Sequence, residues 1–232
     1  MFSLRLLQTL AHTRSRQYHK KIMNFQRTWI VGLLVCASML LSSCMQDYNY
    51  PELLEGDIVI ALGDQFTAGT GASTAFSYPS VLAKSTNALI INAGRAGRGS
   101  SDIMAALSPL LVEHPNVKLV ILSIGFNDIQ QGSDLRFLRT YISEVILLLE
   151  KHKIPMILVG MPKLPYKAGA SAHPIYELLA SSGERVMYEP RAFTSVLNTQ
   201  ANLETPSQFT ATGYRVLAEN IEARMKKEGF IR

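Results

Sequence analysis

The chain has 232 residues, of which 47% are hydrophobic and 18% charged, a balance typical of a globular domain rather than a disordered or fibrous chain. Its formal net charge of +5 is unevenly distributed, because six of the 23 basic residues and none of the 18 acidic residues precede Cys44. The remainder has 17 basic against 18 acidic residues. This near-neutral body excludes the basic surface that a nucleic-acid-binding domain needs, so we expect no nucleic-acid partner.

The N-terminal region has the features of an export signal. Trp29–Leu41 is an uncharged apolar run of signal-peptide length, too short to span a bilayer comfortably, and basic residues precede it. The tetrad Leu41-Ser42-Ser43-Cys44 that follows resembles a bacterial lipobox. This interpretation makes Cys44 the lipidated N-terminus of the mature protein, anchored to a membrane by its acyl chains. An ordinary secretory signal and an uncleaved anchor are the alternatives.

These observations predict three parts: a lipoprotein signal segment (residues 1–43), a tether (44–56) and one domain (57–232). Met23 is an alternative start, because it gives a short basic region of more usual length. The only cysteines are Cys36 and Cys44, so the mature domain has neither a disulfide nor a cysteine metal cluster. We expect the protein in the bacterial cell envelope, with the outer membrane preferred because Met45 and Gln46 are not acidic retention signals.

The domain begins with a strand that runs into a glycine-rich turn. The stretch Ile58–Gly71 opens with five apolar residues, Ile58–Leu62, and continues through Gly63 and Gly69. Glycine at these positions permits close approaches and backbone angles that a side chain would block. The loop continues to Ser77, and Tyr78-Pro79 opens a helix, with proline in its first turn. A strand–turn–helix unit of this kind places ligand-binding groups at the carboxyl edge of the strand.

Strands and helices then alternate to the end of the chain. We predict strands at Ala88–Ile91, Val117–Ile124, Pro155–Val159 and Val186–Tyr188, and helices at Ser100–Glu113 (capped by Ser100 or Ser101), Asp134–Lys151, Ile175–Ser181 and Thr212–Lys227. Alternation of this kind predicts a parallel sheet with helices on both faces. With right-handed crossovers, the natural fold is a flavodoxin-like three-layer α/β/α sandwich.

Three motifs that follow predicted strands identify a family. ALGDQFTAG, NAGRAGRGS and GFND resemble the first three signature blocks of the SGNH (GDSL) hydrolases, above all the arylesterase and lysophospholipase branch. The resemblance runs from about Asp57 to the C-terminus. It implies the SGNH-type sandwich and hydrolysis of carboxylic esters, including lysophospholipids, by a Ser-His-Asp mechanism that needs no cofactor.

Two of the family's oxyanion positions are retained. By the resemblance, Gly97 presents its backbone N–H to a carbonyl oxygen, and Asn127 presents its side-chain amide. The backbone N–H of Gln65 would complete the set. We therefore expect Gln65, Gly97 and Asn127 to bind an acyl ester, a fatty acid or a lysolipid.

The catalytic positions are all replaced. Gln65 stands where the family has its nucleophilic serine, and a glutamine amide is not a nucleophile. Alignment on Gly213-Tyr214 places Thr205 at the aspartate position and Gln208 at the histidine position, and neither side chain accepts a proton at neutral pH. The sequence therefore predicts an inactive or severely impaired member of the family.

Other residues leave alternatives open. Arg95 and Arg98 could hold an anionic group of a ligand or could be solvated loop residues. His173 is the only histidine near the ligand-binding edge and the candidate base of a hydrolase with a rearranged site. His114 and His152 end helices, where the helix dipole favours a cationic ring. A third possibility is an envelope scaffold protein, whose protein partner the sequence does not identify.

Overall fold

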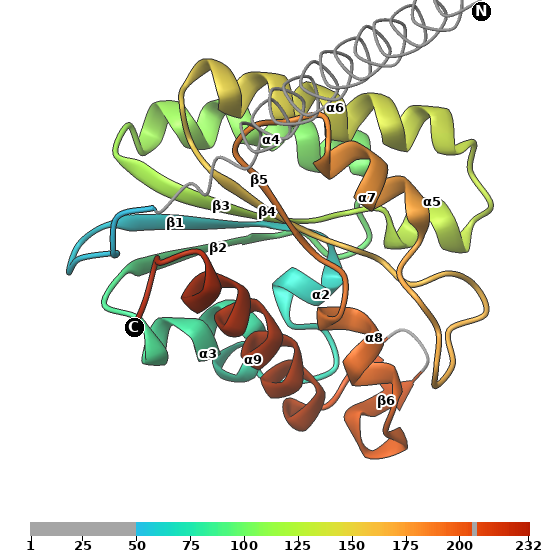
Figure 1. Ribbon diagram of the computed structural model, residues 1–232. Helices are drawn as coiled ribbons and strands as arrows, with labels where there is room; N and C mark the ends of the chain where they lie inside the picture. The colour runs from blue at the N-terminus through green and yellow to red at the C-terminus, as the bar shows by residue number, and fades with distance from the viewer. Residues whose placement is uncertain (1–49, 206–207) are drawn as a thin grey trace, which may run out of the picture. The chain divides into compact units, whose positions relative to one another are not determined.

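The computed structural model describes residues 50–205 and 208–232, which form a three-layer α/β/α sandwich (Figure 1). Its central sheet has five parallel strands in the order β2-β1-β3-β4-β5. The strands are β1 (Ile58–Gly63), β2 (Leu89–Gly94), β3 (Val117–Ser123), β4 (Met156–Val159) and β5 (Val186–Glu189). This strand order is the flavodoxin-like order, so the predicted fold class is confirmed.

Helices cover both faces of the sheet. One face carries α4, α6 and α7, and the other carries α3, α8 and α9 (Figure 1). The helices are α2 (Gln65–Ala68), α3 (Tyr78–Ser85), α4 (Ser100–Glu113), α5 (Phe126–Gln130), α6 (Leu135–Lys151), α7 (Pro174–Ala180), α8 (Ala192–Leu197) and α9 (Ala211–Lys227). The short η1 (Thr74–Phe76) and η2 (Gln200–Asn202) and the antiparallel pair β6 (Leu203–Thr205) and β7 (Gln208–Phe209) complete the described elements.

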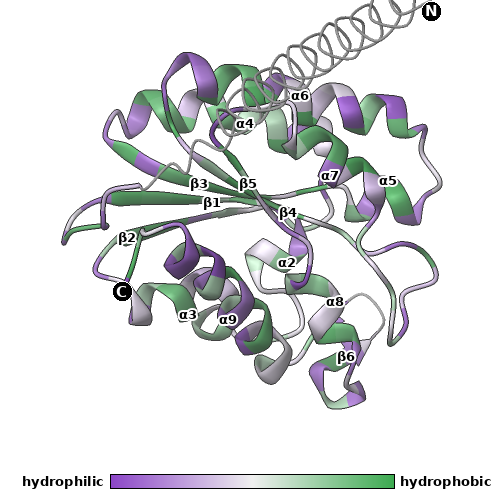
Figure 2. Cartoon of the chain, viewed as in Figure 1, coloured by the Kyte–Doolittle hydropathy of each residue, from purple (hydrophilic) through white to green (hydrophobic). Residues whose placement is uncertain are grey.

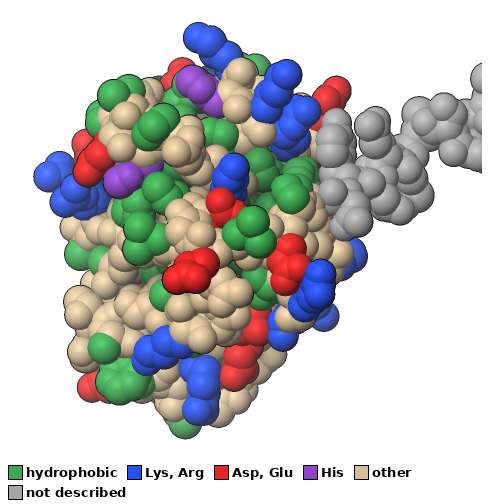
Figure 3. Space-filling model, turned by 90° about the vertical axis from the view of Figure 1, so that its left-hand side faces the viewer, with side chains coloured by type: hydrophobic (Ala, Val, Ile, Leu, Met, Phe, Trp, Pro, Cys, Tyr) green, Lys and Arg blue, Asp and Glu red, His purple; other side chains and the backbone are tan. Residues whose placement is uncertain are grey.

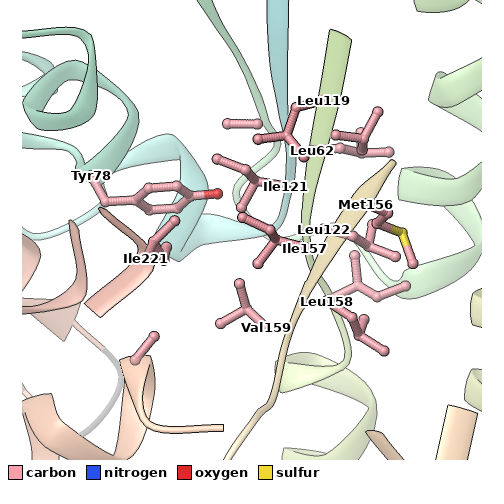
Figure 4. Packing of buried hydrophobic residues seen from close by; sticks show 14 of the residues in the cluster. Leu62, Tyr78, Leu119, Ile121, Leu122, Met156, Ile157, Leu158, Val159 and Ile221 are labelled. Atoms are coloured by element: carbon pink, nitrogen blue, oxygen red, sulfur yellow. The ribbon is translucent and has the colours of Figure 1, made fainter. Parts of the chain in front are cut away.

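The core lies on both faces of the central strands, as their uninterrupted apolar sequences require. Side chains alternate along each strand, so Ile121 and Ile157 point toward Tyr78 of α3 while Leu122 and Leu158 point to the opposite face (Figure 4). These side chains have no exposed surface. Full burial of an aliphatic side chain stabilises the fold by about 1.5–3 kcal/mol, which explains why these strands contain almost no polar residue.

Helix α6 shows how the sequence pattern selects a helix and its buried face. Asp134 is its N-cap, and the Asp134 carboxylate accepts a hydrogen bond from the backbone N–H of Arg136 at 2.9 Å. The buried residues recur at helical spacing: Leu138, Ile142, Val145, Ile146 and Leu149. The outward face of the helix carries charged and polar side chains together with the exposed Phe137 and Leu147 (Figure 2). The predicted helix is therefore confirmed, with Asp134 as its cap.

Several local predictions differ from the structure. Strand β2 continues three residues beyond the predicted end at Ile91, because Asn92, Ala93 and Gly94 pair with Ala61, Leu62 and Gly63 of β1. The predicted side-chain cap of α4 is wrong, since Gly99 is its N-cap. The sequence analysis missed α8 and the β6–β7 hairpin, which are too short for a clear periodicity.

The described N-terminal residues lie against the C-terminus. The ring of Tyr50 stacks on that of Phe230 at a centroid distance of 4.8 Å, and the Leu53 N–H donates to the Phe230 carbonyl at 2.8 Å. Residues 50–56 of the predicted tether thus belong to the folded body. The signal segment, Cys44 and the rest of the tether lie outside the described residues.

The surface is consistent with the near-neutral charge of the body. One face of the molecule shows basic and acidic side chains interspersed with apolar ones (Figure 3). Within residues 50–205 and 208–232, no helix has the length and apolar character needed to cross a membrane.

Candidate functional site

The turn after β1 is built tightly against its neighbours. Asp64 is the N-cap of α2, and its Oδ1 accepts a hydrogen bond from the backbone N–H of Phe66 at 3.0 Å. Helix α2 lies so close to β2 that a Cβ atom on Gly94 would stand 2.1 Å from the backbone nitrogen of Ala68. Glycine at 94 is therefore a steric requirement, and the backbone of residue 65 is held in place by the sheet.

The structure brings Gln65 and Asn127 together, although they are 62 residues apart. Gln65 follows β1 and Asn127 follows β3, and these strands are neighbours in the sheet. The two side-chain amides form a reciprocal pair: Asn127 Nδ2 donates to Gln65 Oε1 at 3.1 Å, and Gln65 Nε2 donates to Asn127 Oδ1 at 3.3 Å. The Gln65 side chain is almost completely buried, with an exposed fraction of 9% for the residue.

A third contact determines the orientation of the pair. Asn127 Nδ2 also donates to the backbone carbonyl of Arg98 at 2.8 Å. Because a carbonyl oxygen can only accept, the nitrogen of the Asn127 amide must face Arg98. Both N–H bonds of Asn127 are then engaged, one with Arg98 and one with Gln65. The oxyanion role expected of Asn127 therefore requires the Gln65 amide to move away.

Asp64 is the most perturbed acid of the site. It is buried, and burial raises the pKa of its carboxyl to about 7, although the N–H groups of Phe66 and Phe126 lower it. Its Oδ2 has no hydrogen-bond partner within the described part of the chain. A charge there is poorly compensated, so the group readily keeps a proton near neutral pH.

Asp128 has a structural role that the sequence analysis missed. Its Oδ2 accepts hydrogen bonds from the Ser100 hydroxyl at 2.6 Å and from the Ser100 backbone N–H at 3.3 Å. The α4 N-terminus is thus capped by a side chain of α5 rather than by its own serines. Asn127 and Asp128 could be recognised in the GFND motif as turn residues. Their hydrogen-bond partners lie in other elements, and a local motif does not reveal them.

The remaining oxyanion position and its arginines are at the surface. Gly97 is exposed and has a φ of +74°, which favours glycine. Arg98 forms a loose ion pair with Asp102, with 3.7 Å between Nη1 and Oδ2, and both side chains are more than half exposed. Arg95 is also exposed, and its backbone N–H donates to the Gly63 carbonyl at 2.9 Å. Neither guanidinium is held in a fixed geometry, so the solvated interpretation of both arginines is favoured.

Thr205 and Gln208, which the sequence analysis aligned with the family's acid and base positions, lie on the β6–β7 hairpin. Thr205 of β6 is paired with Gln208 of β7 across the two strands. Thr205 is exposed and Gln208 partly buried, with its Cβ beside Gly71. In residues 50–205 and 208–232, no hydrogen bond connects the Gln208 side chain to Gln65.

His173 is committed to helix α7. It is the N-cap of that helix, and its Nδ1 accepts a hydrogen bond from the backbone N–H of Ile175 at 3.3 Å. Partial burial lowers the pKa of His173, with a smaller contribution from Lys163. The His173 ring therefore already has a structural role, and no hydrogen bond joins it to the Gln65–Asn127 pair in the described part of the chain. His114 and His152 are the C-cap residues of α4 and α6, as expected.

The polar groups around Gln65 are hydrogen-bonding groups. The described residues contain no group of three or more His, Cys, Asp or Glu side chains that could hold a metal ion. Around Gln65 the polar groups are the amides of Gln65 and Asn127, the buried carboxyl of Asp64 and backbone atoms. This chemistry is suited to hydrogen bonding with a neutral polar group.

Comparisons with known proteins agree with the fold and the motifs. The model of the GDSL-like Lipase/Acylhydrolase family matches residues 61–189, more than half of the chain. This range includes Gln65, Gly97 and Asn127 and ends before Thr205 and Gln208. The chain has no match among functionally curated proteins.

Solved structures with the same fold include several esterases. TesA is 20% identical with a TM-score of 0.66, over 74% of this chain and 99% of that chain. The psychrotrophic esterase EstA from a Pseudoalteromonas species is 16% identical with a TM-score of 0.62, over 74% and 97% of the two chains. AlinE4, an SGNH-hydrolase family esterase, is 25% identical with a TM-score of 0.54, over 76% and 98%.

Proposed function

The chain belongs to the GDSL-like lipase/acylhydrolase family, and we propose that it is a catalytically inactive or severely impaired member, tethered to a bacterial membrane through a lipidated Cys44. The observation that carries the proposal is the amide of Gln65 at the nucleophile position, hydrogen-bonded to Asn127. A glutamine at this position has no atom that can attack an ester and be activated by a base.

The surroundings of Gln65 support the same conclusion. Asp64 is adjacent but is buried beneath the turn, and His173 caps α7. Thr205 and Gln208 provide no proton acceptor on the hairpin. A hydrolase needs both a nucleophile and a base, and in the described part of the chain no hydrogen-bonded pair of that kind links Gln65, Asp64, His173 and Gln208.

The family relation suggests acyl esters, fatty acids or lysolipids as the ligand class. The Asn127 amide is not available to such a ligand, because Gln65 Oε1 already accepts the hydrogen bond that Asn127 would donate to the ligand's carbonyl oxygen. Binding of an ester at this position would therefore have to displace Gln65. We propose that the protein as it stands binds esters weakly and turns them over at a background rate.

Ester hydrolysis by the full-length protein in detergent tests the inactivity. We expect the rate for a short-chain chromogenic ester to lie several orders of magnitude below that of an active family esterase measured in parallel. A residual acceleration of about 10³–10⁴ over water would not contradict this, because an oxyanion site without a triad retains that much. A rate within a few tens-fold of the active esterase would overturn the proposal, and a His173→Ala variant would then show whether the base has moved.

The membrane tether has a separate test. Cells that express the protein and are fed a labelled fatty acid should incorporate the label and yield the protein in the membrane fraction. A Cys44→Ala variant should lose the label and the processed N-terminus, whereas Cys36→Ala should keep both. Equal labelling of the two variants would show that Cys44 is not the lipidation site.

A further inference from the structure

The amide pair has the geometry of a ligand complex formed within one chain. Gln65 presents a carboxamide at the end of a flexible side chain, and Asn127 receives it with one donor and one acceptor. By the family resemblance, Asn127 would donate to the carbonyl oxygen of a substrate. Gln65 Oε1 receives this hydrogen bond instead, so the protein's own side chain occupies the position of the acyl carbonyl.

The side-chain amide of Asn127 is held in one orientation by its surroundings. The backbone carbonyl of Arg98 accepts a hydrogen bond from Asn127 Nδ2 at 2.8 Å. The Asn127 amide cannot turn over without losing this bond. Asn127 follows the buried strand β3, and the adjacent Asp128 is bonded to Ser100 at the start of α4. The Asn127 side chain therefore offers an N–H donor and a C=O acceptor in a fixed order.

This order favours one class of chemical group. A primary carboxamide matches it, because its oxygen accepts from Nδ2 while its nitrogen donates to Oδ1. A carboxylate would place a second acceptor against Oδ1, and an ester has no N–H to donate. An unpaired or repelled polar group at a buried position costs about 1–3 kcal/mol, enough to discriminate between these groups by roughly tenfold or more.

We propose that the Gln65–Asn127 pair is a self-occupied carboxamide-binding site. While Gln65 is in place, it excludes esters and other acyl groups from Asn127. Removal of its carboxamide opens a site that binds small primary amides in preference to carboxylates and esters. The inference concerns recognition alone and does not depend on whether the chain hydrolyses esters.

Two truncations of Gln65 have matching small-molecule probes. Gln65→Ala removes one methylene and the carboxamide, which together correspond to acetamide. Gln65→Gly removes one carbon more and corresponds to propionamide. Both variants keep the backbone of α2, which is capped by Asp64 and packed against Gly94. Glycine lowers helix stability by about 1 kcal/mol, so Gln65→Ala is the primary variant.

Binding is measured on the full-length protein in detergent, by titration of acetamide, acetate and methyl acetate with NMR detection of the side-chain amide signals. We expect acetamide to bind Gln65→Ala at least tenfold more tightly than the wild type, and at least tenfold more tightly than acetate binds the same variant. Propionamide should be preferred over acetamide by Gln65→Gly. Gln130→Ala, which truncates an exposed glutamine on α5, should behave as the wild type does.

Three results would overturn the proposal. Equal binding of acetamide to Gln65→Ala and to the wild type would show that Gln65 does not occupy the site. Equal affinities of acetamide and acetate for Gln65→Ala would show that the site does not distinguish a carboxamide from a carboxylate. Retention of acetamide binding in the double variant Gln65→Ala/Asn127→Ala would place it elsewhere. If Gln65→Ala does not fold, as judged by circular dichroism, Gln65→Gly and its propionamide titration decide in the same way.

Discussion

The turn after β1 and the β6–β7 hairpin carry the residues that the sequence analysis aligned with the family's catalytic positions, and the two regions hold these residues very differently. In the turn, the residue exposures are 1% for Asp64 and 9% for Gln65, and the glutamine amide is hydrogen-bonded to Asn127. On the hairpin, Thr205 is exposed and Gln208 only partly buried. A replacement in the turn must fit a closed environment, whereas one on the hairpin meets solvent.

The difference follows from where each region joins the fold. The turn leaves β1, which has β2 and β3 as direct neighbours, so its groups are surrounded by other strand ends. The hairpin is a separate two-stranded unit, and Phe209 is its buried contact with α2 through the ring of Phe66 at 4.5 Å. Gln65 is thus part of the core, whereas Thr205 and Gln208 lie at its margin.

The largest effect is expected at the contact between the two regions. Phe209 is buried and its ring packs on Phe66, Phe193 and Tyr214. Phe209→Ala removes these contacts and leaves a cavity, so we expect a loss of about 4 kcal/mol in the free energy of unfolding, measured by urea titration. The same truncation at the neighbouring Gln208 should cost less than about 1 kcal/mol. Equal losses would show that the hairpin is not held by Phe209.

The second effect tests how tightly the turn is built. Gly94→Ala places a Cβ atom against backbone atoms of α2, the nearest at 2.1 Å. Backbone atoms cannot move out of the way as a flexible side chain can. We therefore expect the free energy of unfolding to fall by about 3 kcal/mol and the NMR signals of the Asn127 side-chain amide to shift. Gly99→Ala is the matched control, because a Cβ there meets no atom within 4 Å, and it should lower the free energy of unfolding by no more than about 1 kcal/mol, the cost of alanine at the N-cap of α4. An unchanged free energy of unfolding in Gly94→Ala would show that α2 can shift to make room for the added Cβ atom.

The third effect is a pH dependence that Asp64 confers on the fold. Its folded-state pKa of about 7 lies above the ordinary value of 3.8 for an aspartate carboxyl. Between these values the folded state holds a proton that the unfolded state has released, so this contribution to stability is complete below about pH 4 and is lost as the pH rises to about 7.

Asp64→Asn isolates this contribution, because the amide has the same shape and does not titrate. Relative to the wild type, the variant should gain on the order of 2 kcal/mol in unfolding free energy between pH 5 and pH 8. Urea titrations of both proteins at the two pH values measure it. A constant difference between the two proteins would show that Asp64 does not change its protonation in this range.

The smallest effect is expected on the hairpin. Gln208→His introduces the residue that the family resemblance predicts at this position, which is partly buried and whose glutamine side chain has no hydrogen bond to other described residues. We expect the unfolding free energy to change by less than about 0.5 kcal/mol and the imidazole to titrate near its ordinary pKa in an NMR titration. A loss of several kcal/mol would show that the hairpin constrains residue 208 as closely as the turn constrains residue 65.

The sequence by itself determined the fold class, the long helices and the residues at the family positions. These depend on local patterns: apolar runs such as Val117–Ile124, the helical spacing within Asp134–Lys151, and motifs that follow strands. Because carboxyl ends of parallel strands meet at one edge, it was also predictable that Gln65 and Asn127 lie near each other.

Only the tertiary structure decided what these residues do there. The donors of Asn127 are engaged by the carbonyl of Arg98 and the amide of Gln65, which come from separate loops. Asp128 caps a helix that starts 28 residues earlier, and burial raises the pKa of Asp64. Hydrogen bonding and desolvation depend on atoms brought together from distant parts of the chain. A linear pattern therefore indicates which groups are available, while their partners are chosen by the packing of the strands and loops.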